Sequence, residues 1–227
     1  MSDGNDKPNG RPLAEAKDAV LAAAKSMYHR GIVEGTAGNV SARVDDGSVV
    51  VTPSSLDYEA MVLDDLVVLD LDGAVLAGER SPTSEKGVHL AALAAHPEAA
   101  AVVHCHAKHA SMFTVAHQPI PAAIDEFVVY IGGDVPVCEY HPSGSDKLGE
   151  VVAAALGDRS AALMANHGLV TIGKSVEDAL HSALVVEHNA EIVWGARLLG
   201  GVSELPEKAG TDFAGVYDFI RRQTWRS

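Results

Sequence analysis

Two histidines stand one residue apart in an apolar run, in the segment Val102-Val103-His104-Cys105-His106. Successive side chains of a strand point to opposite faces, so a strand places His104 and His106 on the same face, where they could hold a metal ion. A third histidine, His167, follows another short apolar run, in the turn Asn166-His167-Gly168. Three imidazoles without an obvious fourth protein ligand leave one coordination position open, which is typical of a catalytic metal site.

A carboxylate and three hydroxyl-rich turns supply the other candidate groups. Glu85 lies in the first turn of an expected helix, in Pro82-Thr83-Ser84-Glu85, where it could be an acid or base or simply complement the helix dipole. Helix starts that carry hydroxyls and free backbone N–H groups suit anions. Two further turns, 35–41 and 52–55, have the same character. Taken alone, each of them is ordinary turn chemistry.

These residues must be positioned by a strand-rich first half and by a second half in which helices and strands alternate. The alanine-rich run 13–30 predicts a helix that ends at Gly31, and Asp45-Asp46-Gly47 and Asp72-Gly73 indicate tight turns between antiparallel strands. Further helices are expected at 83–96, 108–117, 145–156 and 175–199, and strands at 40–44, 48–52, 66–71, 74–77, 101–106, 161–165 and 170–173. This order predicts an α/β fold, with helices packed against a mixed sheet. Solvated or capping roles are expected for the other histidines considered, which are His89, His96, His109, His117, His181 and His188.

Length and composition narrow the class of protein. A chain of 227 residues suits one domain over 1–227, with a disordered start at 1–10, a linker-like stretch at 200–210 and a C-terminal tail at 200–227. The net charge of −14 disfavours nucleic acid and anionic membranes as partners. The two cysteines, Cys105 and Cys138, suggest neither a disulfide framework nor a cysteine zinc site. This cysteine usage makes a reducing cytoplasm the expected location, and the lack of an apolar span of about 20 residues predicts a soluble protein.

Five motifs in order carry a resemblance to a known family. They are Gly38-Asn39-Val40-Ser41, Val51-Thr52-Pro53-Ser54-Ser55, Pro82-Thr83-Ser84-Glu85, His104-Cys105-His106 and Asn166-His167-Gly168-Leu169. As a set they resemble the class II aldolases of the fuculose-1-phosphate aldolase and adducin-like superfamily. The resemblance implies a three-layer α/β/α fold around a mainly antiparallel sheet, one zinc ion, and a homotetramer with active sites at subunit interfaces.

The resemblance also implies roles for single residues. Zinc would be held by His104, His106 and His167, with Glu85 as the acid/base. Manganese or cobalt could replace zinc, because three imidazoles suit several first-row metals. Substrate phosphate would be held by a set of small and hydroxyl-bearing residues: Gly38, Asn39, Ser54, Ser55, Thr83 and Ser84. This set contains no cation, so an acidic protein would bind phosphate through local N–H and O–H donors.

The implied chemistry makes use of each of these parts. Retro-aldol cleavage leaves negative charge on the ketone-derived fragment as an enediolate, which a divalent metal stabilises as a Lewis acid. Glu85 would move the proton on the neighbouring carbon, and partial burial is expected to raise its pKa toward the working pH. Phosphate anchoring would fix the reacting carbon over the metal.

Two positions concern the aldehyde half of the reaction. Glu126 stands where the related aldolases place a tyrosine that helps to protonate the aldehyde oxygen. It resembles in placement the catalytic glutamate of methylthioribulose-1-phosphate dehydratases, which lack an acid at the position of Glu85. Ribulose-5-phosphate 4-epimerases carry aspartate at the position of Glu85, so Glu85 disfavours that class as well. Tyr217 is the candidate for a catalytic C-terminal tyrosine, although its segment could equally be a packed helix, and Tyr58 and Tyr130 are expected to be packing residues.

The expected function is a zinc-dependent class II aldolase. It would reversibly cleave a small ketose 1-phosphate, such as L-fuculose 1-phosphate or a deoxypentulose 1-phosphate analogue, to dihydroxyacetone phosphate and an aldehyde. A metal-dependent dehydratase or a sugar-acid decarboxylase of the same superfamily is the enzymatic alternative. A non-catalytic adducin-like association module is a third, but such modules lack the metal histidines that this chain retains.

Overall fold

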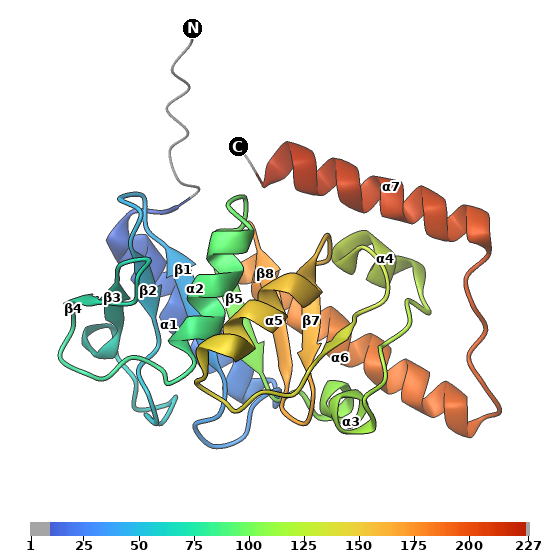
Figure 1. Ribbon diagram of the computed structural model, residues 1–227, viewed down its shortest axis with the longest axis horizontal. Helices are drawn as coiled ribbons and strands as arrows, with labels where there is room; N and C mark the ends of the chain where they lie inside the picture. The colour runs from blue at the N-terminus through green and yellow to red at the C-terminus, as the bar shows by residue number, and fades with distance from the viewer. Residues whose placement is uncertain (1–9, 226–227) are drawn as a thin grey trace, which may run out of the picture.

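A computed structural model describes residues 10–225 and contains one eight-stranded sheet of order β4-β3-β2-β1-β5-β8-β7-β6 (Figure 1). Neighbouring strands pair antiparallel, except β6 and β7, which are parallel. The bounds are β1 Asn39–Arg43, β2 Val49–Val51, β3 Val67–Leu69, β4 Val75–Ala77, β5 Ala101–Cys105, β6 Val137–Cys138, β7 Ala161–Met164 and β8 Leu169–Gly173. The mainly antiparallel α/β fold is therefore confirmed. The expected disordered start lies, apart from Gly10, outside the described residues.

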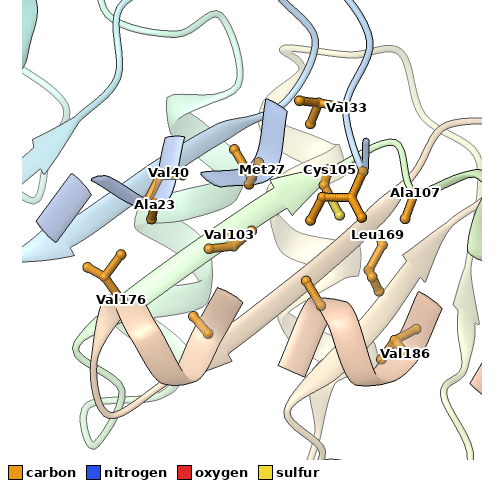
Figure 2. Packing of buried hydrophobic residues seen from close by; sticks show 14 of the residues in the cluster. Ala23, Met27, Val33, Val40, Val103, Cys105, Ala107, Leu169, Val176 and Val186 are labelled. Carbon is orange, nitrogen blue, oxygen red and sulfur yellow. The ribbon is translucent and has the colours of Figure 1, made fainter. Parts of the chain in front are cut away.

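Helices cover both faces of the sheet and make three layers. The helices are α1 Leu13–His29, α2 Lys86–Ala95, α3 Lys108–Ala116, α4 Asp125–Ile131, α5 Asp146–Leu156, α6 Val176–Leu198 and α7 Glu207–Thr224, with one 3-10 turn, η1 Leu63–Asp65. One core joins α1 and α6 to the sheet through residues such as Val40, Val103 and Leu169 (Figure 2). A second core joins α2 and α5 to the opposite face, which Val102 and Val170 line. The alternation of neighbours such as Val102 and Val103 follows from the period of a strand.

The face of β1 that meets α2 is polar. Val40 and Ala42 belong to the core under α1, whereas Asn39, Ser41 and Arg43 alternate with them and are also buried. Arg43 Nε donates to the Ala99 carbonyl at 2.9 Å, and its Nη2 donates to the Leu93 carbonyl at the end of α2. A row of hydrogen-bonding side chains therefore separates the middle of the sheet from this helix.

Two short elements, α4 and β6, were not expected from the sequence, and α7 confirms the packed helix that was one of two expectations for the segment of Tyr217. Helix α4 has seven residues, and β6 has two, too few for hydrophobic periodicity to be read. Helix α7, which occupies most of the expected C-terminal tail, lies along α4 in Figure 1. Its Arg221 donates to the Glu98 carboxylate at 2.8 Å and to the Tyr217 hydroxyl at 2.8 Å. Within residues 10–225, no helix is both long and apolar enough to cross a membrane.

Candidate active site

The three histidines meet at one end of the sheet. His104 lies in β5, His106 follows that strand, and His167 lies in the turn between β7 and β8. Because β8 pairs with β5, with Leu169 opposite Cys105, the β7–β8 turn lies beside the end of β5. The possible ligand atoms of the three imidazoles all lie within 4.8 Å of one another. The sequence prediction of one cluster therefore agrees with the geometry.

The imidazoles direct ring nitrogens toward one another. His104 Nδ1 lies 3.0 Å from the Leu169 carbonyl, which can only accept, so Nδ1 donates to it and Nε2 is directed into the cluster. That Nε2 is 3.1 Å from His106 Nε2. Burial lowers the pKa of His106 to about 4 and also lowers the pKa of His167. Neutral imidazoles whose nitrogens converge fit a divalent cation, and zinc, manganese and cobalt all accept such ligands.

Helix α3 fixes the segments that carry His106 and His167. Glu187 of α6 accepts hydrogen bonds from the backbone N–H groups of His109, at 3.0 Å, and Ala110, at 2.9 Å, at the start of α3. At the other end, the Asn166 N–H donates to the Thr114 carbonyl at 3.1 Å. Asn166 has a left-handed φ of 55°, which asparagine tolerates better than most residues. The loops around two ligands are thus tied to one short helix.

Glu85 lies between the histidines and two hydrogen-bond donors. Its Oε2 is 3.2 Å from His104 Nε2, and its Oε1 is 3.1 Å from His167 Nε2. Asn39 Nδ2 donates to Oε2 at 3.0 Å, and Ser143 Oγ donates to Oε1 at 2.9 Å. Each carboxylate oxygen therefore faces one histidine and one neutral donor.

The expected rise in the pKa of Glu85 is wrong. Burial does favour the neutral carboxylic acid, but hydrogen bonding and charge at His104 and the hydrogen bond from Asn39 together hold the pKa of Glu85 well below its usual range. Glu85 is therefore ionised at neutral pH. The resting side chain is a proton acceptor.

A cavity of about 180 Å³ opens beside Glu85. All six residues expected to hold phosphate line it, together with Glu85 and two of the histidines: Gly38, Asn39, Ser54, Ser55, Thr83, Ser84, Glu85, His106 and His167. Thr36 and Ser143 also line it, and no lysine or arginine does so among the described residues. Its donors are hydroxyls, an amide and backbone N–H groups, which suit an anion without a formal positive charge.

The loops around the cavity are held together by backbone hydrogen bonds. The Ser54 N–H donates to the Ser81 carbonyl at 3.0 Å, and the Thr83 N–H donates to the Thr52 carbonyl at 3.1 Å. The Tyr58 hydroxyl lies 2.8 Å from the carbonyls of both Ala37 and Gly38, as suits a buried packing residue. These contacts keep three separate hydroxyl-rich turns around one space.

Two expected site residues lie elsewhere in this chain. Glu126 is exposed on α4 and does not line the cavity. Tyr217 belongs to α7 and its side chain is buried against the rest of the chain, where its hydroxyl is 2.9 Å from Ser160 Oγ. Ser160 precedes β7 whereas His167 follows that strand, so Tyr217 lies at the opposite end of it. The cluster and these two residues are not brought together within one chain.

Several residues behave differently from the sequence expectation. His89 is only 1% exposed and lies within α2, so the expected solvated or capping role is wrong for it. His96 is 7% exposed and therefore not solvated, but it does occupy the C-cap position of α2. Tyr130, expected to pack, is 42% exposed. Ser143, which touches Glu85, was not singled out at all, because a lone serine in a loop carries no signal before the fold places it.

Comparisons with known proteins agree with this geometry. A relative from Bacillus thuringiensis serovar kurstaki, 5-deoxy-D-ribulose 1-phosphate aldolase, is 31% identical over 212 residues, which cover 93% of this chain and 99% of the relative. An L-ribulose-5-phosphate 4-epimerase from Salmonella typhi is 35% identical over 197 residues, covering 82% of this chain and 86% of the epimerase.

A solved structure of L-fuculose 1-phosphate aldolase superposes with a TM-score of 0.86 at 29% identity, covering 91% of this chain and 97% of the other. Residues 18–194 match the family described as Class II Aldolase and Adducin N-terminal domain. The fold, the histidine cluster and this match over most of the chain lead to one conclusion: the protein belongs to the class II aldolase and adducin N-terminal domain family.

Proposed function

We propose that this chain is a zinc-dependent aldolase that reversibly cleaves a small ketose 1-phosphate to dihydroxyacetone phosphate and an aldehyde. The observation that carries the proposal is the ionised Glu85, which lies 3.1–3.2 Å from two clustered histidines and borders a cavity lined by hydroxyls. L-fuculose 1-phosphate and deoxypentulose 1-phosphates are the substrates of first choice, because two similar proteins are named for such reactions.

The residues around the cavity have separate tasks in this reaction. His104, His106 and His167 would hold the metal, which when bound supplies a Lewis acid for negative charge on substrate oxygens. The phosphate ester would bind the hydroxyls and N–H groups of Ser54, Ser55, Thr83 and Ser84 and the turn at Gly38 and Asn39. The N-terminus of α2 adds its partial positive charge at the same place.

Glu85 would transfer the proton at the carbon beside the ketone. As a carboxylate it removes that proton from dihydroxyacetone phosphate in the condensation direction, and it returns the proton to the same carbon during cleavage. Asn39 and Ser143 would keep its two oxygens directed toward the substrate. Their hydrogen bonds favour the ionised form, so Glu85 begins condensation ready to accept a proton.

Self-association belongs to this proposal. We expect a homotetramer in which the exposed Glu126 reaches the site of a neighbouring subunit and exchanges the proton of the aldehyde oxygen. The expected catalytic role of Tyr217 does not fit this arrangement, because its side chain is buried in its own chain. The chain offers apolar surface for such contacts, on α3 and the end of α6: Met112, Val115, Trp194, Leu198 and Leu199 are 38–91% exposed. The two free cysteines are both buried thiols, which suits a reducing cytoplasm.

Proton exchange provides a direct test. Zinc-loaded protein should exchange one carbon-bound proton of dihydroxyacetone phosphate with deuterated water, as followed by proton NMR. Glu85→Gln should lower this exchange at least about 10³-fold, because the base is lost. Glu126→Gln is the matched control: it should retain exchange and lose cleavage, since exchange involves no aldehyde. Intact protein that binds zinc but exchanges no proton would refute the aldolase.

The products separate the competing reactions. An aldolase releases dihydroxyacetone phosphate from a ketose 1-phosphate, whereas a dehydratase releases water and a decarboxylase releases carbon dioxide. Similarity to a 4-epimerase adds one further assay, the interconversion of L-ribulose 5-phosphate and its epimer. Turnover of that substrate without aldehyde release would show that the enzyme is an epimerase and not an aldolase.

A further inference from the structure

A buried row of hydrogen bonds runs from Glu85 into the interior of the protein. Asn39 Nδ2 donates to Glu85 Oε2 at 3.0 Å, Asn39 Oδ1 is 2.5 Å from His89 Nε2, and His89 Nδ1 is 2.7 Å from Ser41 Oγ. The four side chains come from the polar face of β1 and from the start and middle of α2. Their residues are 0–6% exposed, so water cannot replace a missing partner.

The donors and acceptors in this row fit together in only one way. Asn39 directs its NH2 group to a Glu85 oxygen, so its carbonyl oxygen faces His89. That oxygen only accepts, so His89 carries its proton on Nε2. Nδ1 is then an acceptor, and the Ser41 hydroxyl donates to it. The orientation of the Asn39 amide thus determines the directions of the other two hydrogen bonds.

We propose that His89 is a positioning residue, which holds the Asn39 amide in the orientation that donates to Glu85 and which Ser41 keeps in the required tautomer. The inference rests on the proposed function, because it deepens the role of the same carboxylate. His89 touches neither the cavity nor the clustered histidines and would act only through Asn39.

The main chain of Asn39 is fixed by its neighbours, so only the orientation of its side-chain amide depends on His89. Asn39 pairs with His104 across β1 and β5, so its main chain is fixed beside a metal ligand. The preceding Gly38 has a φ of 80°, and a Cβ there would lie 2.7 Å from Val33 and 2.8 Å from the His104 carbonyl. Rotation of the amide by a half turn would still bring its oxygen against the Glu85 carboxylate. The hydrogen bond from His89 opposes that rotation.

Packing alone does not account for a histidine here. The residues around it on α2 that face the sheet are apolar, namely Val88, Ala92 and Leu93, and a leucine would continue that surface. Burying an imidazole without hydrogen-bond partners is unfavourable, so its polar atoms must be matched by Asn39 and Ser41. The polar face of β1 supplies both partners.

Two substitutions at His89 separate positioning from packing. His89→Leu removes both ring nitrogens and should lower kcat for aldol cleavage about 10- to 100-fold while KM and zinc content stay within about twofold. His89→Gln keeps an N–H that reaches Asn39 and should restore kcat to within about fivefold of the parent. His96→Gln, at another buried histidine at the end of α2, is the matched control and should leave kcat unchanged.

Nitrogen NMR of the zinc-loaded full chain tests the same idea without turnover. The His89 ring should be the neutral form protonated on Nε2 between pH 6 and pH 8, and Ser41→Ala should populate the other tautomer. A parent ring protonated on Nδ1, or charged, would overturn the proposal. So would a His89→Gln variant as slow as His89→Leu. Protein that shows the Nε2–H tautomer but no aldol cleavage would instead refute the proposed function alone.

Discussion

Gly168 determines how closely the turn that carries His167 approaches the end of β5. A Cβ at this position would lie 2.6 Å from the Cys105 carbonyl and 3.0 Å from ring carbons of both His104 and His106. Gly168→Ala must therefore push the turn away from β5 and separate the three imidazoles. We expect zinc affinity to fall about 10- to 100-fold, as for other changes that disturb ligand orientation, which a competition titration with a chelator would measure.

A second glycine provides the control for that substitution. Gly215 lies in α7, and a Cβ there meets nothing within 4 Å. Gly215→Ala should leave zinc affinity unchanged and raise the free energy of unfolding by about 0.5–1 kcal/mol, because alanine favours the helix. Equal zinc affinity in the two variants would contradict the role assigned to Gly168.

His89 also makes stability depend on pH. Burial lowers its pKa to about 3 in the folded protein, against an ordinary value of 6.5. Above pH 6.5 the ring is neutral in both states and contributes no pH dependence. As the pH falls from 6.5 toward 3, only the unfolded chain takes up the proton, so the free energy of unfolding falls by up to about 1.4 kcal/mol per pH unit.

Replacing the histidine removes this contribution. In urea titrations between pH 7 and pH 4.5, His89→Gln should lose less stability than the parent over the same interval, with the largest difference at the lowest pH. Parallel stability curves for the two proteins would show that the His89 ring is protonated equally in both states.

The sequence identified site residues whose type and local position carry information. The histidines stand at the end of a strand and in a turn, and the hydroxyls stand in turns at a helix start, so their chemistry could be expected before the fold was known. Ser143 and His89 have no such local signal. Ser143 lies 58 positions from Glu85 and His89 lies 50 from Asn39, so only folding brings each pair together.

At the scale of elements, α3 links the chemistry to the helical layer. Helix α3 begins at Lys108, two residues after His106. The Glu187 carboxylate of α6 accepts hydrogen bonds from two of the first backbone N–H groups of α3 and from the His109 ring. Unpaired N–H groups at a helix start are normally satisfied by a side chain from the same segment. Here the cap comes from another helix, so it also fixes where α3, and with it His106, lies against α6.

Removal of that cap should affect both stability and metal binding. Glu187→Ala should lower the free energy of unfolding by about 2 kcal/mol and weaken zinc binding several-fold, because the segment at His106 loses its anchor. Glu191→Ala, one turn later on α6 and exposed, should change neither quantity measurably. Denaturant unfolding and chelator competition on both variants provide the check, and unchanged zinc binding in Glu187→Ala would limit Glu187 to a purely structural role.

The elements differ in how well local sequence predicts them. The long α1 and α6 and the strands of the antiparallel meander were expected within a few residues, because their apolar periodicity or tight turns are local. Strand β6 has two residues and is defined only by its parallel pairing with β7. Helix α4 has seven residues before its C-cap at Gly132. Both elements are too short to show a hydrophobic period. The docking of α7 depends on Arg221 reaching Glu98, 123 positions earlier in the chain.

At the scale of the whole molecule, the two faces of the sheet have different tasks. The face under α2 carries the polar row from Asn39 to Arg43 and leads to the cavity, whereas the face under α1 and α6 is a continuous apolar core. In the proposed reaction, the acidic chain, with a net charge of −14, would accept a phosphate ester through this local arrangement of donors.

Helix α6 exposes large apolar side chains near its C-terminal end, although its inward side is also apolar. Val186, Ala190 and Val193 are buried, yet Trp194 is 43% exposed and Leu198 72% exposed. Large apolar side chains that lie exposed next to one another mark a surface that another protein covers, so this end of α6 near α3 is expected to be buried in the proposed tetramer. This surface lies beside the start of α3, where the Trp194 and His109 ring centroids are 5.6 Å apart, and a neighbouring subunit of the proposed tetramer would approach the site there.

Charge at that surface should therefore separate the subunits. The parent chain of 23.7 kDa should sediment as a tetramer of about 95 kDa, and Leu198→Glu should shift it toward the monomer because a carboxylate resists burial in an apolar contact. Cleavage activity should fall with the tetramer, while the zinc content, set by three histidines of one chain, should stay near one per chain. Leu76→Glu, at an exposed leucine on the edge strand β4, is the control and should remain a tetramer. A monomeric parent with full activity would show instead that the site is complete within one chain.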